Sequence, residues 1–253
     1  MFIKFARMQK RDNNIIGEIM KKGFTLAEVL ITLGIIGVVA AIILPTVLSN
    51  IRNKGYVEKL QKIYSMLGQA TKFVTIDVGI DPENWDFSHY NDGDVNDSLN
   101  RYILDSYISH FKVTSAYIKN YNQYMSILQK KKVKYYYLNG NEASSVLQSG
   151  YHMYHVAYVV ELSDGASIGF SFSENKNGGL LFPLETKKIV ILYIVDVNGL
   201  AKPNQIGRDI FYFALYKNGK LEPYNINDTS DCTKDGKGYS CAGRIFNEGK
   251  MNY

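Results

Sequence analysis

The sequence predicts an α+β protein in which a long N-terminal helix, its first half embedded in a membrane, packs on a head that contains an antiparallel β-sheet. Three observations predict this fold class: an apolar stretch near the N-terminus, a helical apolar stripe after it, and short strand-like segments separated by turns in residues 151–253. With 253 residues, of which 46% are hydrophobic, the chain is long enough to bury a core. We expect a leader (1–23), the long helix (24–77) and a head (78–253) that is helical or loop up to residue 150 and forms the sheet in 151–253.

The basic charge of the chain is concentrated in the leader. The formal net charge is +5, and residues 1–23 carry +4 of it, which leaves +1 for residues 24–253. The net charge therefore does not indicate a nucleic-acid-binding head. The four His residues are scattered, and no zinc-helix, phosphate-binding-loop or nucleophile-elbow motif occurs, so we expect no catalytic activity.

Residues 24–48 are apolar with one exception. These 25 residues, FTLAEVLITLGIIGVVAAIILPTVL, contain a single charged residue, Glu28. At about 1.5 Å per residue, a helix of this length crosses a hydrocarbon layer of roughly 30 Å. Positive charge is denser before the stretch than after it, so the positive-inside rule places the leader in the cytoplasm and the head on the other side of the membrane.

The residues around Gly23 resemble a known processing site. The run KKGFTLAE (residues 21–28) is similar to the recognition sequence of type IV prepilins and type II secretion pseudopilins. The resemblance implies a pilin-like fold, cleavage by a prepilin peptidase between Gly23 and Phe24, and methylation of the new Phe24 amine. It also implies a single-pass protein of the bacterial inner membrane that later joins other pilin or pseudopilin subunits in an extracytoplasmic filament. Pro45 stands where many members of this family have a helix-bending proline.

Glu28 is the candidate assembly residue, together with Pro45. A carboxylate in hydrocarbon costs about 2.5–3.5 kcal/mol on insertion scales, so it needs a partner. After cleavage, the Phe24 amine would be a cation four residues away on the same helical face. In the family that the sequence resembles, this carboxylate pairs with the N-terminal amine of a subunit in the growing filament.

After the membrane segment, apolar residues recur at intervals of three and four. This spacing predicts that the helix continues to about Asp77, with its second half packed on the head. The residues of this stripe are Val57, Leu60, Tyr64, Leu67, Thr71 and Val74.

The head begins with a predicted loop over 79–97 and a helix over 99–111. Beyond residue 151, β-branched and aromatic segments alternate with short turns, and short connections imply antiparallel neighbours. Residues 189–195 are apolar on both alternating faces, which is typical of a central strand. The predicted strands are 154–162, 166–172, 189–197, 210–216 and a short one near Leu221.

Cys232 and Cys241 are the two cysteines of the chain. Outside the inner membrane they can oxidise and close a ten-residue loop, which stabilises the fold by about 2–3 kcal/mol. Neither a CxxC spacing nor a neighbouring His favours a zinc site.

Residues 196–209 carry oxygen ligands at spacings that suit a hard cation such as calcium. The ligands would be Asp196, Asn198, Asn204 and Asp209, although the EF-hand pattern is absent. The alternative interpretation is a tight connection in which Asn, Gly and Pro fix turns and the Asp side chains accept hydrogen bonds from backbone amides. No cofactor is required under either interpretation.

The segment 117–137 is rich in Tyr and Lys. Such a segment can bind single-stranded nucleic acid by stacking and charge, but a solvated helix face is the favoured interpretation.

We therefore interpret the chain as a structural subunit of a type IV pilus-like or type II secretion pseudopilus filament, with a length that favours a minor subunit. The alternative is a membrane-anchored binding module or adhesin that does not polymerise.

Overall fold

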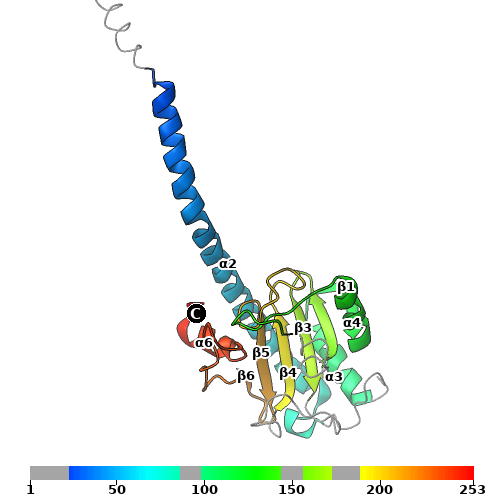
Figure 1. Ribbon diagram of the computed structural model, residues 1–253. Coiled ribbons are helices and arrows are strands. Elements are labelled where there is room, and N and C mark those ends of the chain that lie inside the picture. Colours follow the sequence, from blue (N-terminus) through cyan, green and yellow to red (C-terminus); the bar gives the residue numbers. More distant parts are fainter. Residues whose placement is uncertain (1–22, 86–97, 144–155, 173–188) are drawn as a thin grey trace, which may run out of the picture. The chain divides into compact units, whose positions relative to one another are not determined.

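The computed structural model describes residues 23–85, 98–143, 156–172 and 189–253 (Figure 1). The predicted leader up to residue 22 and most of the loop predicted over 79–97 lie outside these residues. The chain divides into two compact units, the first ending at Ile51 and the second running from Arg52 to Tyr253. The predicted α+β class, a long N-terminal helix followed by an antiparallel sheet, is confirmed.

The long helix α2 (Leu26–Val78) supplies the whole described helical part of the first unit. Its most apolar stretch has a mean hydropathy of 2.6 over 18 residues, and none of that stretch is buried by the described chain. A helix this apolar on all sides is stable where a membrane or other helices cover it. Pro45 lies inside α2 without ending it. Its ring nitrogen has no hydrogen to donate to the preceding turn. A local bend or loosening of the helix at Pro45 remains a prediction.

In the second unit, α2 buries one face against the head. It ends where Gly79 adopts a left-handed backbone (φ 68°) and its amide donates to the Thr75 carbonyl at 3.1 Å, a common helix C-cap. The predicted stripe is confirmed except at Tyr64, which is half-buried while its neighbour Ile63 is buried. The buried residues of α2 are Val57, Leu60, Ile63, Leu67, Ala70, Thr71 and Val74.

Within the described residues, one six-stranded antiparallel sheet forms with its strands in chain order, a meander. Each strand pairs with the next, and the β4–β5 pairing brings Asp196 opposite Ile210. The strands are β1 (Val113–Asn120), β2 (Val156–Leu162), β3 (Ser167–Phe172), β4 (Ile189–Asp196), β5 (Ile210–Tyr216) and β6 (Leu221–Pro223).

Strand β1 corrects the prediction that residues 78–150 are helix and loop. It precedes α4 (Tyr121–Lys130) directly and pairs with β2 through an irregular register between Val113 and Ile118. The Tyr- and Lys-rich composition of this region obscured the β-branched residues Val113, Thr114 and Ile118.

The two faces of the sheet are covered by different elements. One face packs on α2 and α3 (Ser98–Ser109), and its core includes Leu60, Leu67 and Phe213. The other face packs on α4 and the segment after it, with Leu128 and Tyr212 in the core. Strand β4 is buried along its whole length, as predicted for a central strand.

A chain of hydroxyl groups connects α2, α3 and β4 inside the first of these cores. Tyr193 donates to the Tyr107 hydroxyl at 2.8 Å, Tyr107 donates to Thr71 Oγ1 at 2.9 Å, and Thr71 donates to the Leu67 carbonyl at 2.8 Å. Burial raises the pKa of Tyr107 to about 12. Each hydroxyl thus has a partner that compensates for its removal from water.

We expect Thr71→Val to lower the free energy of unfolding by about 1–2 kcal/mol, because the shape of the side chain is kept while the buried Tyr107 hydroxyl loses its acceptor. Urea unfolding of the full chain in detergent measures this. Thr75→Val is the matched control, since Thr75 is only partly buried and donates to a helix carbonyl. Equal losses for the two variants would contradict the role of the hydroxyl chain.

Candidate functional site

The predicted cleavage position lies in non-helical backbone. Gly23, Phe24 and Thr25 precede α2, which begins at Leu26. The Phe24 side chain is 86% exposed, and a Cβ on Gly23 would meet no atom within 4 Å. An exposed, non-helical peptide is the form of chain that proteases most readily cleave.

Thr25 and Glu28 form a capping box at the start of α2. The Thr25 amide donates to Glu28 Oε2 at 2.8 Å, and the Glu28 amide donates to Thr25 Oγ1 at 3.2 Å. The Thr25 hydroxyl also donates to the same carboxylate oxygen at 2.9 Å. Sequence reasoning missed Thr25, although Thr-x-x-Glu before an apolar run is the known signal for this cap. The Glu28 carboxylate therefore satisfies one backbone donor, the Thr25 amide, at the positive end of the helix dipole.

Only one oxygen of the Glu28 carboxylate is used in this cap. Within the described residues, Glu28 Oε1 makes no hydrogen bond and the side chain is exposed. The carboxylate is thus held in place by its own helix and still presents an acceptor outward.

The β4–β5 connection holds the four predicted cation ligands, and the structure gives them different roles. Asp209 is fully buried, and its two oxygens accept from the backbone amides of Asn204 (2.8 Å) and Gln205 (2.6 Å). This is the turn-fixing role that the sequence offered as the alternative to metal binding. Asp209 thereby fixes the position of Asn204, whose backbone is left-handed (φ 52°).

The other three predicted ligands keep oxygens without a partner. Asp196 uses Oδ1 to accept from the Asn198 amide at 3.1 Å, and its Oδ2 is buried and unbonded. Asn198 Oδ1 and Asn204 Oδ1 are also buried without a hydrogen bond. Asp196 and Asn204 are each only 5% exposed, so their unpaired oxygens lie below the protein surface.

In the part of the chain that the structure describes, no Lys, Arg or His forms an ion pair with Asp196 or Asp209. Burial raises the pKa of Asp196 well above its ordinary value, and the charge of Asp209 raises it further. Burial also raises the pKa of Asp209, against the lowering effect of the Gln205 and Asn204 amides. Lys59 is the cation that lowers the pKa of Asp196, but the effect is small beside burial.

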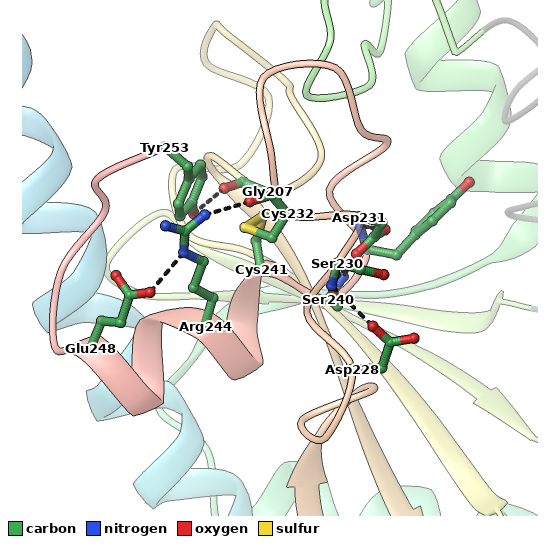
Figure 2. Close-up of a disulfide and its surroundings, with 11 residues drawn as sticks. Gly207, Asp228, Ser230, Asp231, Cys232, Ser240, Cys241, Arg244, Glu248 and Tyr253 are labelled. Carbon is green, nitrogen blue, oxygen red and sulfur yellow. Dashed lines mark hydrogen bonds and ion pairs between the residues drawn. A yellow bond between two sulfur atoms is a disulfide. The ribbon is translucent and has the colours of Figure 1, made fainter.

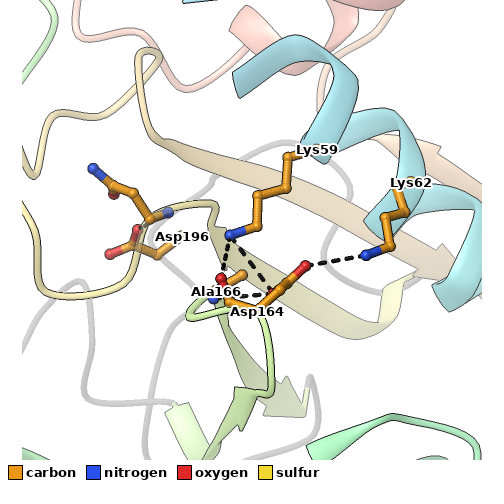
Figure 3. A network of polar contacts seen from close by, with 6 residues as sticks. Lys59, Lys62, Asp164, Ala166 and Asp196 are labelled. Atoms are coloured by element: carbon orange, nitrogen blue, oxygen red, sulfur yellow. Dashed lines mark hydrogen bonds and ion pairs between the residues drawn. The ribbon is translucent and has the colours of Figure 1, made fainter. Parts of the chain in front are cut away.

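Lys59 is engaged elsewhere. Its amine donates to the Asp164 carbonyl at 2.8 Å and lies 3.6 Å from Asp164 Oδ1, while Lys62 pairs with Asp164 Oδ2 at 3.2 Å. Figure 3 shows these contacts joining Lys59 and Lys62 to Asp164 and none joining them to Asp196. Partial burial of Asp164 opposes ionisation, but the Ala166 amide and the two lysines together lower its pKa.

Helix α2 reaches this connection through residues that the sequence did not single out. The side-chain nitrogen of Asn198, Nδ2, donates to the Tyr56 hydroxyl at 2.9 Å and to the Lys202 carbonyl at 3.2 Å. Asn53, one turn before Tyr56, has a further buried oxygen without a partner. No local motif connects α2 with residue 198, so this contact was not predictable from spacing.

Cys232 and Cys241 form a disulfide at the start of α6 (Cys241–Glu248), with Cα atoms 4.9 Å apart (Figure 2). Asp231 next to it accepts from the amides of Tyr239 and Ser240 and from the Ser240 hydroxyl. Arg244 donates to the Cys232 carbonyl at 2.7 Å and to Glu248 at 2.8 Å.

The region around the disulfide contacts the β4–β5 connection at Gly207. Gly207 has φ 80°, and a Cβ there would lie 2.8 Å from Cys241 Sγ. Tyr253 donates its hydroxyl to the Gly207 carbonyl, and the Arg244 guanidinium lies 5.5 Å from the Tyr253 ring centre. Gly207 is therefore required for the close approach of the two segments.

The Tyr- and Lys-rich segment is partly a core element. Tyr124 and Tyr135 are buried, and their hydroxyl oxygens lie 3.3 Å apart. Buried rings are not available to stack on bases, so these two tyrosines do not support nucleic-acid binding.

Comparisons with known proteins match two parts of the chain. Residues 20–44 match a prokaryotic N-terminal methylation motif, and residues 46–245 match a family of unknown function (DUF6613). No curated protein and no solved structure shows significant similarity to the chain. The first match confirms the resemblance to type IV pilins and pseudopilins that KKGFTLAE indicates.

Proposed function

The chain belongs to the DUF6613 family of unknown function and is a type IV pilin-like precursor, and on this premise we propose that it is a structural subunit of a pilus-like or pseudopilus filament. Cleavage by a prepilin peptidase between Gly23 and Phe24 would release the leader, and methylation would follow on the Phe24 amine. The proposal includes insertion in the bacterial inner membrane before assembly, with the leader cytoplasmic and the head outside.

One observation carries this proposal: Gly23 and Phe24 lie in exposed, non-helical backbone directly before an uncovered apolar helix that bears a single carboxylate. An ordinary signal peptide has its cleavage site after the apolar run, which would remove the helix from the mature protein. Cleavage before the run leaves the helix attached to the head, where it can serve first as a membrane anchor and then as a filament core.

The geometry of Glu28 supports a role in assembly. The capping box orients the carboxylate without using Oε1, so an ammonium group from a neighbouring subunit can bind there with no rearrangement of the helix. In the apolar environment of packed helices, an ion pair formed this way offsets part of the cost of burying the two charges, and either charge left unpaired would cost more. Each subunit would therefore be placed in register by a charge that is costly to leave unpaired.

Processing is tested by co-expressing the full chain with a prepilin peptidase and measuring the intact mass. We expect wild type to lose residues 1–23 and to gain one methyl group, whereas Gly23→Val should keep its leader, because a branched side chain replaces the uncovered glycine at the cut. Gly34→Val, which changes a glycine inside the helix, is the matched control and should be cut normally. An uncut wild-type chain in the presence of active peptidase would contradict the proposal.

A further inference from the structure

We propose that the head binds anionic phospholipid headgroups through a basic patch, formed by the chain segments 130–142, 202–208 and 234–238. The patch would hold the head on the bilayer in which the helix of the same chain is anchored. The inference rests on the proposed membrane anchoring and not on filament formation, and its test distinguishes the failure of one from the failure of the other.

The basic patch contains most of the excess positive charge of the head. Its three segments carry a net charge of +6, with two acidic residues, Glu142 and Asp235. Residues 24–253 together carry only +1, which leaves −5 for the rest of them. The near-neutral total therefore conceals a strongly asymmetric distribution of charge. The basic residues of the patch are Lys130, Lys131, Lys132, Lys134, Lys202, Arg208, Lys234 and Lys237.

Backbone hydrogen bonds join the three segments of the patch into one surface. The Tyr136 amide donates to the Asn204 carbonyl at 3.0 Å, and the Ile206 amide donates to the Tyr136 carbonyl at 2.8 Å. The Leu138 amide donates to the Lys237 carbonyl at 3.1 Å. The first segment therefore contacts both of the others, so the basic residues are gathered on one part of the head.

The ammonium groups of the patch are accessible to a ligand. All seven of its lysines are exposed, and Arg208 is half-buried. Lys134 pairs with Glu142 at 2.9 Å, but both side chains are exposed, and such a surface pair is weak enough to open. Lys237 Nζ lies 5.5 Å from the centre of the Tyr137 ring, a contact that leaves its charge in place. The patch therefore attracts anions.

The patch lies at the end of the sheet where α2 first contacts the head. Lys59 of α2 contacts the β2–β3 turn (Figure 3), and Asn198 of the β4–β5 connection donates to Tyr56. The turn and the connection belong to the same end of the sheet, because Ser167 after the turn pairs with Asp196 before the connection. The second segment of the patch is part of this connection. The patch is therefore close to the beginning of α2 in the second compact unit.

Chain length keeps this end of the head near the bilayer. The apolar run ends at Leu48, and Tyr56 follows eight residues later within α2. Eight helical residues span about 12 Å, whatever angle the two compact units take. The headgroup layer on each side of the hydrocarbon core is about 5–8 Å thick, and charges act over a Debye length of about 8 Å at physiological ionic strength. The end of the head beside Tyr56 is therefore held near the lipid phosphates.

A phospholipid surface fits the patch better than single-stranded nucleic acid does. Single strands bind largely by stacking their bases on exposed aromatic rings. Tyr135 is buried, and the Tyr137 ring contacts the Tyr239 ring edge-on and has Lys237 Nζ over it. Clusters of about four to eight basic residues near a membrane helix are typical of anionic-lipid binding. The bilayer is also always present at high effective concentration, because the anchor tethers the head to it.

The test uses the full chain in nanodiscs with one copy per disc, which excludes contacts between copies. Hydrogen–deuterium exchange of the patch amides is compared between discs of phosphatidylcholine alone and discs with about 30% phosphatidylglycerol. At about 50 mM NaCl we expect exchange to be at least about 5-fold slower with the anionic lipid, because binding suppresses local opening. The difference should vanish near about 500 mM NaCl, where screening shortens the Debye length.

Three outcomes would overturn the inference. Equal exchange in the two kinds of disc would show that the anionic lipid does not bind the patch. Slower exchange on adding a single-stranded oligonucleotide to phosphatidylcholine discs, with no effect of phosphatidylglycerol, would make the patch a nucleic-acid surface. A chain that enters neither kind of disc would contradict the proposed membrane anchor, and this inference with it. A chain that enters both without lipid-dependent exchange contradicts the patch alone.

The triple variant Lys130→Gln/Lys131→Gln/Lys132→Gln removes three of the positive charges and keeps polar, exposed side chains. We expect its phosphatidylglycerol effect to fall below about 2-fold, because the attraction to an anionic surface grows with the number of nearby charges. Its exchange in phosphatidylcholine discs should equal that of wild type, which shows that the fold is kept.

The matched control is Lys72→Gln/Lys217→Gln/Lys220→Gln, which removes the same charge elsewhere on the head. Lys217 and Lys220 lie in the β5–β6 turn, at the opposite end of β5 from the β4–β5 connection, and Lys72 lies in the last turns of α2. This control should keep the full effect of phosphatidylglycerol. An equal loss in both triple variants would show a general effect of net charge and overturn the assignment to the patch.

Discussion

A Glu28→Ala variant is expected to insert in the membrane and to be cleaved at Gly23, but to be incorporated into filaments at least about 100-fold less than wild type. Removing one member of an ion pair in an apolar environment costs about 3–5 kcal/mol, because the other charge stays buried and unpaired. Here the remaining charge would be the Phe24 amine of a neighbouring subunit. The measurement is the ratio of sheared filament protein to membrane protein by quantitative immunoblot.

Two controls separate the charge of Glu28 from its other roles. Glu28→Gln keeps a side-chain oxygen that can accept from the Thr25 amide, so it retains the capping box but loses the charge. It should fail in assembly as Glu28→Ala does. Glu58→Ala removes an exposed carboxylate from the same helix, paired with Lys54 at 3.9 Å, and should assemble normally.

If Glu28→Gln assembled normally, the capping box rather than the charge would explain the effect. If Glu28→Ala assembled normally, the proposal of a filament subunit would be contradicted, and a membrane-anchored binding module that does not polymerise would be favoured.

Replacing both Cys232 and Cys241 by Ala is expected to lower the free energy of unfolding by about 2–3 kcal/mol. The disulfide joins residues nine apart in sequence, and its removal restores the conformational freedom of that loop in the unfolded chain. Urea unfolding of the oxidised full chain in detergent measures the loss. Both sulfurs are fully buried, so alanine also leaves a small cavity that adds to the cost.

Wild type measured in reducing agent is the natural control, because it lacks the bond but keeps the sulfur atoms. Its loss of stability should be close to that of the double variant and no greater. An unchanged urea midpoint in both samples would contradict a stabilising role for the disulfide.

The sequence was most informative where one physical pattern dominated. The stripe from Val57 to Val74 was predicted closely, because the helical period leaves little choice about which face is buried. The strand at Ile210–Tyr216 was predicted from its β-branched and aromatic residues and the turns beside it. The central position of β4 followed from its continuous apolar run.

The remaining features depend on contacts between residues far apart in the chain. Strand β1 pairs with β2 across more than 30 residues, and its own composition did not indicate a strand. Tyr56 meets Asn198 across the head, and Gly207 meets Cys241. The four oxygen-bearing residues of the β4–β5 connection were predicted as a set. Only the fold shows that Asp209 accepts hydrogen bonds from backbone amides, whereas Asp196, Asn198 and Asn204 each have a buried side-chain oxygen without a hydrogen bond in the described residues.

The contact between Tyr253 and Gly207 has a practical consequence for labelling. A purification tag or fluorescent protein fused directly after Tyr253 would disturb the position of this side chain. Its hydroxyl donates to the Gly207 carbonyl of the β4–β5 connection, and the Arg244 guanidinium lies over its ring. A flexible Gly- and Ser-rich spacer should precede any such fusion. An insertion in the exposed turn at Asn218–Gly219 is a safer position for an epitope, because a Cβ on Gly219 would meet no atom within 4 Å.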